Sequence, residues 1–152
     1  MKQTLGALAI AAFLAVAFAA RAAGMMGTAT ITPAASIKWT AGTGDMKGTQ
    51  VAVLYGDPTK KGSQYAVRLK SPDGTYIPPH YHKDLELATI ISGTFNLGVG
   101  DVMDASKMTA LGPGSFAALP GGVHHYGTTK GVTVIELHGI GPETMVMVKG
   151  AK

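Results

Sequence analysis

The chain of 152 residues has room for one domain, whose core can bury about two thirds of the surface of the unfolded chain. Its 13 Lys and Arg residues against 9 Asp and Glu residues give a net charge of +4. Without Lys2 and Arg21 of the N-terminal segment the charge is +2, which makes no electrostatic case for nucleic acid as a partner. It has no cysteine, which excludes disulfide bonds and thiolate metal ligands.

The N-terminal segment has the composition of a signal peptide. Lys2 precedes an apolar run over residues 5–20, and small residues surround Arg21. A membrane anchor is the alternative, but the run is short for a span and ends at Arg21. We therefore expect a signal peptide at 1–22, a mature domain at 23–152 in the periplasm or secreted, and no stable membrane span after processing. The mature chain keeps 11 basic and 9 acidic residues, a net charge of +2.

The rest of the chain predicts many short strands joined by tight turns, because Gly and Pro recur every few residues. Pro72-Asp73-Gly74 and Pro120-Gly121-Gly122 are typical turn sequences. The apolar pattern predicts strands at 36–40, 50–56, 64–69, 77–82, 85–92, 94–99, 115–119, 124–128, 133–138 and 144–148, and a helical turn is expected within 103–108. The fold class is therefore all-β, with a single domain after the signal peptide.

Metal-ligating side chains occur at even spacing in the middle of the chain. His80, His82 and Glu86 share one parity, and alternate side chains of an extended strand point to the same face. His125 follows a Pro/Gly turn and is placed to approach from a neighbouring strand, whereas His124 has the opposite parity and should point away. Three imidazoles and one carboxylate make a site for one divalent transition metal, and the set allows Fe, Mn, Zn, Cu or Ni.

These segments resemble the two signature motifs of the cupin superfamily. The first motif, G(x)5HxH(x)3E(x)6G, is met at every fixed position by Gly74, His80, His82, Glu86 and Gly93. The second, G(x)5PxG(x)2H(x)3N, is met by Gly114, Pro120, Gly122 and His125, with Thr129 in place of the Asn. More narrowly, the chain looks like a group of small secreted bacterial single-domain cupins. The resemblance implies a jelly-roll barrel, a double-stranded β-helix, in which His80, His82, Glu86 and His125 hold one metal.

The two faces of the strand at 85–92 differ. Residues of even number share the parity of the histidines and should face the barrel interior, whereas Leu85, Leu87, Thr89 and Ile91 should face outward. This apolar outer face needs a cover, either from the segment around Trp39 or from a second subunit. Because dimers are common among cupins, the resemblance favours a homodimer.

Two functions fit a four-ligand site with open coordination positions. One is a metal-dependent enzyme of dioxygenase, isomerase or hydrolase type, acting on a small molecule that chelates through oxygen. Glu86 and His138 are then the candidates for proton transfer, although His138 is equally interpretable as a hydrogen-bonded histidine at the barrel rim. Arg68 and Lys83 are candidates for binding an anionic substrate, unless they face solvent. The alternative is a metal or small-ligand binding or sensor protein, since "PPHYHKDLE" resembles zinc-bound anti-sigma regulators.

Overall fold

The computed structural model describes residues 28–150, so the predicted signal peptide at 1–22 lies outside the described residues. The chain divides into two units, Met1–Ile31 and Thr32–Lys152. Residues 28–31 have no regular structure, and the second unit holds every strand described. No helix within residues 28–150 is long and apolar enough to span a membrane.

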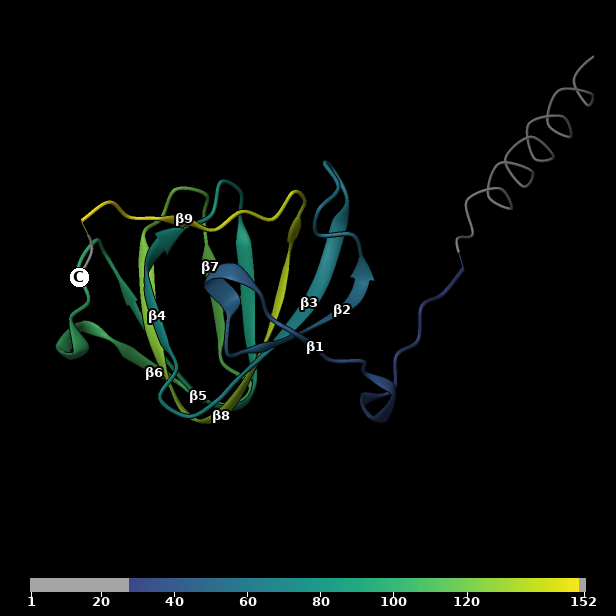
Figure 1. Cartoon of the computed structure of the whole chain (residues 1–152), viewed down its shortest axis with the longest axis horizontal. Helices are drawn as coiled ribbons and strands as arrows, with labels where there is room; N and C mark the ends of the chain where they lie inside the picture. Colours follow the sequence, from purple (N-terminus) through teal and green to yellow (C-terminus); the bar gives the residue numbers. More distant parts are fainter. Residues whose placement is uncertain (1–27, 151–152) are drawn as a thin grey trace, which may run out of the picture. The chain divides into compact units, whose positions relative to one another are not determined.

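The second unit is a curled antiparallel sheet with three short 3-10 turns (Figure 1). Its strands are β1 Thr40–Ala41, β2 Gln50–Gly56, β3 Gln64–Ser71, β4 Tyr76–Tyr81, β5 Glu86–Val99, β6 Thr109–Leu111, β7 Phe116–Leu119, β8 His125–Ile140 and β9 Val146–Met147. The 3-10 turns are η1 Ala34–Ser36, η2 Gly44–Met46 and η3 Ala105–Lys107. The predicted all-β, jelly-roll barrel class is confirmed.

Two long strands, β5 and β8, organise the barrel. They pair from Leu87 opposite His138 to Val99 opposite His125, and each contributes to both halves of the sheet. In one half they are flanked by β3, β2 and β1 on one side and by β7 on the other, while in the second half their neighbours are β4, β9 and β6. The two halves face each other across the core in the manner of a jelly roll.

A change of register lets β5 bend between these halves. The pairing with β8 shifts on both sides of Ser92, next to Gly93, whose φ is 73°. A Cβ at Gly93 would lie 2.6 Å from the Val132 carbonyl oxygen and 2.5 Å from the Thr133 Oγ1. The last glycine of the first motif is therefore required both for its backbone conformation and for close approach to β8.

The core lies between the two halves of the sheet. Its buried centre is Ala88, Ile90, Phe95 and Ile135, and partly buried aliphatic residues from β4, β5, β6, β7 and β8 pack around it. On β5, Glu86, Ala88 and Ile90 are buried while Ile91 is 40% exposed, which confirms the predicted alternation. This alternation directs Glu86 into the barrel, on the same face as the core.

Several predicted elements differ from the structure. The strands expected at 85–92 and 94–99 are one strand, β5, and those expected at 124–128 and 133–138 are one strand, β8, because bulges bend both strands without ending them. The strand expected at 36–40 is mostly η1 and extended chain, since pairing with β2 begins only at Thr40. β6 was not predicted, because three residues carry too little pattern. The helical turn within 103–108 is confirmed as η3.

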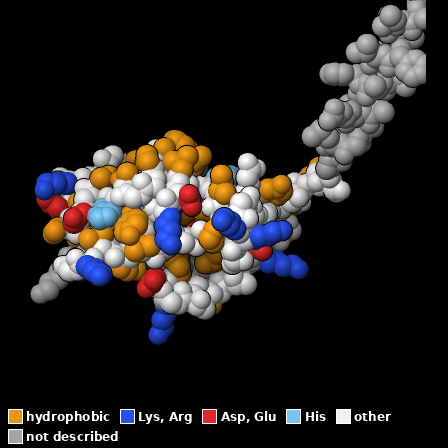
Figure 2. Space-filling model, turned by 90° about the horizontal axis from the view of Figure 1, so that it is seen from above, with side chains coloured by type: hydrophobic (Ala, Val, Ile, Leu, Met, Phe, Trp, Pro, Cys, Tyr) orange, Lys and Arg blue, Asp and Glu red, His pale blue; other side chains and the backbone are white. Residues whose placement is uncertain are grey.

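Part of the outer face is covered within the chain. The Lys70 Nζ atom on β3 lies 5.6 Å from the centroid of the Trp39 ring. Leu85 and Ile91 stay about half exposed, and Phe116 on β7 is 59% exposed. Figure 2, seen from above, likewise shows hydrophobic side chains at the surface between charged ones. The N-terminal segment is therefore an incomplete cover, and the homodimer remains a prediction.

Candidate metal centre

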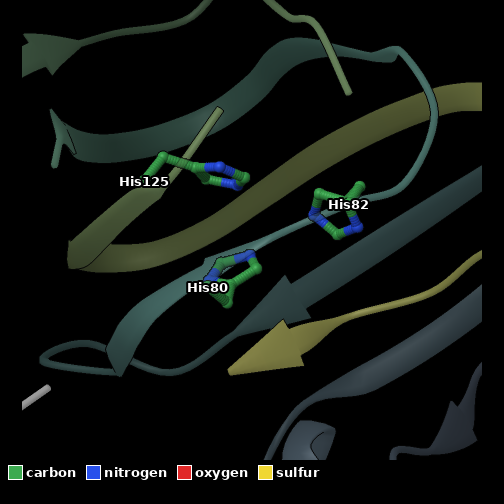
Figure 3. Close-up of side chains that lie close together, drawn as sticks. All are labelled: His80, His82 and His125. Atoms are coloured by element: carbon green, nitrogen blue, oxygen red, sulfur yellow. The ribbon is translucent and has the colours of Figure 1, made fainter. Parts of the chain in front are cut away.

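Three histidines that are far apart in sequence come together inside the barrel. His80 on β4 stands opposite His125 at the start of β8, and His82 follows just after β4 ends. One nitrogen from each ring lies within 4.8 Å of the others. The ring centroids are 4.2 Å apart for His80 and His125, 5.1 Å for His80 and His82, and 5.3 Å for His82 and His125. Figure 3 shows the three rings turned toward one another.

Backbone carbonyl oxygens hold the orientation of all three rings. Each ring donates a hydrogen bond from Nδ1: His80 to the Pro78 carbonyl at 2.8 Å, His125 to the Val123 carbonyl at 3.0 Å and His82 to the Thr144 carbonyl at 2.7 Å. An imidazole that donates from Nδ1 presents the lone pair of Nε2, and metal-ligating histidines are fixed by outer hydrogen bonds of this kind. The donor set therefore fits a first-row transition metal bound through three Nε2 atoms.

The three rings differ in protonation, because carboxylates adjoin His82 while burial dominates at His80 and His125. Burial lowers the pKa of His80 to about 4 and also lowers the pKa of His125, so both are neutral near pH 7. Burial acts in the same direction on His82, but hydrogen bonds with Glu143 and Glu86 outweigh it and raise the pKa of His82 to about 10. A metal that binds Nε2 of His82 must release the proton held there.

Glu86 adjoins the cluster from β5. It is 7% exposed, and its Oε2 atom lies 2.6 Å from Nε2 of His82. The carboxylate contacts one histidine of the group, and within residues 28–150 the mutually close set consists of His80, His82 and His125. Glu86 as the fourth ligand, and as a proton-transfer group, stays a prediction.

A second carboxylate at the cluster was missed from sequence. Glu143 Oε1 lies 3.3 Å from Nδ1 of His82, and its side chain is 38% exposed. It is in the loop after β8, where Glu143 N donates to the Pro58 carbonyl at 2.7 Å. No spacing in the sequence connects Glu143 to His82, because the loop is brought there only by the closure of the barrel.

The structure places His124 and His138 away from the cluster. His124 Nδ1 lies 2.6 Å from Asp101 Oδ1, and its ring stacks on Tyr81 at 5.0 Å, so it points away from His125 as predicted. His138 does not reach the pocket wall, because it pairs with Leu87 on the outer face of the barrel. Its side chain is 46% exposed, and its Nε2 lies 3.0 Å from a carboxylate oxygen of a neighbouring glutamate.

Arg68 belongs to the same outer face as His138. Its Nε donates to Glu136 Oε2 at 2.7 Å, and Glu136 lies between Arg68 of β3 and Thr89 of β5 in the sheet. Burial raises the pKa of Glu136, but hydrogen bonds from Arg68 and His138 outweigh burial and hold it below the usual range. Neither Arg68 nor His138 is therefore available to a substrate inside the barrel.

Comparisons with known proteins agree with this geometry. The family model described as "Cupin domain" matches residues 67–140, which contain all four predicted ligands. The chain belongs to the cupin superfamily. No curated protein sequence matches it closely enough to count as a relative.

Solved structures of low sequence identity share the fold. The polyketide cyclase RemF from Streptomyces resistomycificus has 17% identity and a TM-score of 0.64, over 80% of this chain and 86% of that one. KdgF from Halomonas sp. has 19% identity and a TM-score of 0.57, over 73% and 93%. An RmlC-like cupin from Shewanella frigidimarina has 15% identity and a TM-score of 0.56, over 73% and 89%. At these identities the likeness concerns the fold alone.

Proposed function

We propose that this cupin binds one divalent first-row transition metal through His80, His82, Glu86 and His125 and is a metal-dependent enzyme. The observation that carries the proposal is the shared hydrogen bonding of the three rings, each held through Nδ1 by a backbone carbonyl. Histidines that only fill a core need no common direction for Nε2. Histidines that bind one ion do.

The substrate in this proposal is a small molecule that chelates through oxygen. Four protein ligands leave one or two positions on a five- or six-coordinate metal, and a metal at this site supplies Lewis acidity or redox chemistry of the dioxygenase, isomerase or hydrolase type. Glu86 is the carboxylate of the set. Its neighbour is Nε2 of His82, so it is placed to hold or release a proton at the edge of the metal site.

The metal itself is Fe, Mn, Zn, Cu or Ni in this proposal, since an N3O set accommodates each of them. Metal analysis of protein isolated from its native compartment identifies the ion, and we expect about one per chain. A redox-active metal favours dioxygenation, whereas zinc favours isomerisation or hydrolysis. Protein without any metal in native material and after reconstitution would contradict the proposal.

We further propose export to the periplasm or medium and assembly as a homodimer. Export is supported by the composition of residues 1–22, with Lys2 before a long apolar run. The homodimer is supported by the apolar outer face, where Leu85 is 49%, Ile91 40% and Phe116 59% exposed. Fractionation of cells and sedimentation of the purified protein test the two proposals.

A non-catalytic protein that binds a metal or a small ligand is the second candidate. It is favoured by the segment "PPHYHKDLE", which resembles zinc-bound anti-sigma regulators. The two candidates are separated by turnover. Beta-diketones, hydroxylated aromatics, keto acids and sugar derivatives are incubated with protein carrying the native metal, with oxygen uptake and product formation measured. If none is consumed and another exported protein co-purifies only with the metal-loaded form, the binding function replaces the enzyme.

A further inference from the structure

The hollow beside the metal cluster has an unusual composition. It opens next to His82 and Glu86, and its four other polar side chains come from three places in the sequence: Tyr65 on β3, Asp84 before β5, and Glu143 and Thr144 after β8. Three of its nine lining residues are carboxylic and none is Lys or Arg. Even with a divalent metal in place, the three negative charges of the carboxylates exceed the two positive charges of the metal. The site therefore keeps an excess of negative charge.

Basic residues do not compensate this charge from nearby positions on the wall. Arg68 is paired with Glu136 at 2.7 Å on the outer face. Lys83 is exposed and is absent from the lining of the hollow. An anionic ligand entering here therefore meets like charge without a counter-charge from the protein.

Tyr65 provides a second, independent feature of the hollow. Its side chain is 6% exposed, yet its hydroxyl makes no hydrogen bond with the described residues. Within residues 28–150 no side-chain nitrogen or oxygen is both shut off from solvent and without a partner. The Tyr65 hydroxyl therefore opens onto the hollow, where it is free to hydrogen-bond to a ligand.

The backbone confines this phenol to its position. A Cβ at Gly139 of β8 would lie 2.6 Å from the Tyr65 hydroxyl oxygen, so the ring fits only because residue 139 is glycine. Burial, reinforced by the charges of Glu143, Glu86 and Asp84, raises the pKa of Tyr65. The phenol thus keeps its proton near neutral pH and is a donor as well as an acceptor.

We infer that this hollow accepts a hydroxyl or amino group of a neutral or cationic ligand and rejects a carboxylate, with Tyr65 and Glu143 contacting that group. The inference rests on the proposed function, because the metal anchors the chelating end of the ligand. It narrows the substrate class: keto acids are disfavoured, and hydroxylated aromatics, polyols and amino alcohols are favoured. Asp84 and Glu143 act here as specificity-determining residues.

A matched series of catechols tests this selectivity. Dopamine, catechol and 3,4-dihydroxybenzoate share one chelating group and differ in carrying a positive, zero or negative charge. Each is titrated anaerobically by calorimetry into zinc-loaded protein, since zinc has no redox chemistry. Each affinity is divided by the affinity of the same compound for zinc in buffer, which removes differences in the catechol itself.

After this correction, we expect dopamine and catechol to bind about fivefold or more tightly than 3,4-dihydroxybenzoate, the effect of a few partly screened charges at close range. In the double variant Asp84→Asn and Glu143→Gln the ratio should approach one. The control Asp101→Asn removes a carboxylate outside the hollow and should leave the ratio of affinities unchanged. Tyr65→Phe should weaken catechol binding by about fivefold, the contribution of one hydrogen bond, at full zinc content.

Zinc content, measured before each titration, distinguishes a failure of the proposed metal binding from a failure of the inferred ligand selectivity. Protein that takes up no zinc contradicts the proposed function and with it this inference. Protein with full zinc that binds 3,4-dihydroxybenzoate as tightly as catechol, or binds none of the three compounds, overturns the inference alone. A preference that persists in the double variant also overturns it, since the charge of Asp84 and Glu143 would then not be the cause.

Discussion

His124 and His125 offer a matched pair for testing the metal centre, because they are adjacent in sequence and opposite in direction. His125 is 3% exposed, faces His80 and donates from Nδ1 to the Val123 carbonyl. His124 contacts Asp101 outside the barrel. His125→Ala removes one of the three inward nitrogens, whereas His124→Ala leaves all three in place. Each substitution is measured with and without metal, so that any effect on the apo protein cancels.

The magnitude follows from linkage. A ligand that binds only the folded state at a hundredfold excess over its Kd stabilises it by about 2.7 kcal/mol. For a domain of this size, about 3 °C of Tm corresponds to 1 kcal/mol, so zinc should raise the Tm by about 8 °C. The wild type and His124→Ala should show this rise. His125→Ala should show at most a small part of it, because affinity depends on the complete ligand set.

The assay is thermal unfolding followed by circular dichroism, in chelator and then in excess zinc, with zinc content determined after gel filtration. His82→Ala serves as a second ligand variant and should behave like His125→Ala. If His125→Ala keeps the full rise in Tm and one zinc per chain, the assignment of the centre is wrong. If His124→Ala loses the rise instead, the two histidines have been assigned the wrong way round.

Four further predictions concern the proton-transfer group, the core, a surface ion pair and the proposed dimer interface. Glu86→Gln should bind metal more weakly and lower turnover of any substrate found, and a variant as active as wild type would exclude proton transfer by this residue. Ile90→Ala should destabilise the domain by about 2–5 kcal/mol in urea unfolding because Ile90 is 1% exposed, and a loss below 1 kcal/mol would contradict the assigned core. Since the pKa of Glu136 is lowered, its pair with Arg68 stabilises the fold above the carboxyl's ordinary value of 4.5 and is lost as the pH falls through the lowered value. Glu136→Gln should therefore flatten stability over that acidic range by about 0.5–1 kcal/mol, and an unchanged profile would refute this. Leu87→Asp should convert a dimer to monomers in sedimentation, whereas a monomeric wild type would remove the reason for the interface.

Much of the fold and the candidate site could be predicted from local spacing. Turn sequences separate the strands, and the parity of β5 places Glu86 on the buried face together with Ala88 and Ile90. The opposite parity of His124 and His125 likewise predicted that His125 points into the barrel and His124 away from it. These predictions succeed because side chains alternate along an extended chain whatever its partners are. The same argument does not explain why His80 and Glu86 meet, because a bend at 83–84 separates β4 from β5.

Pairing between distant strands determines which other side chains surround the metal cluster. His138 shares β8 with His125 but has the opposite parity, and it faces outward because its neighbour Leu137 is the residue that packs against the core. Glu143 and Tyr65 reach the surroundings of the metal cluster only once the barrel closes, because they lie 61 and 17 residues away from His82 in the sequence. The absence of a basic residue from the hollow also depends on which face of β3 carries Arg68. Spacing along one strand determines which side chains can share a face, whereas only the closed sheet determines what that face meets.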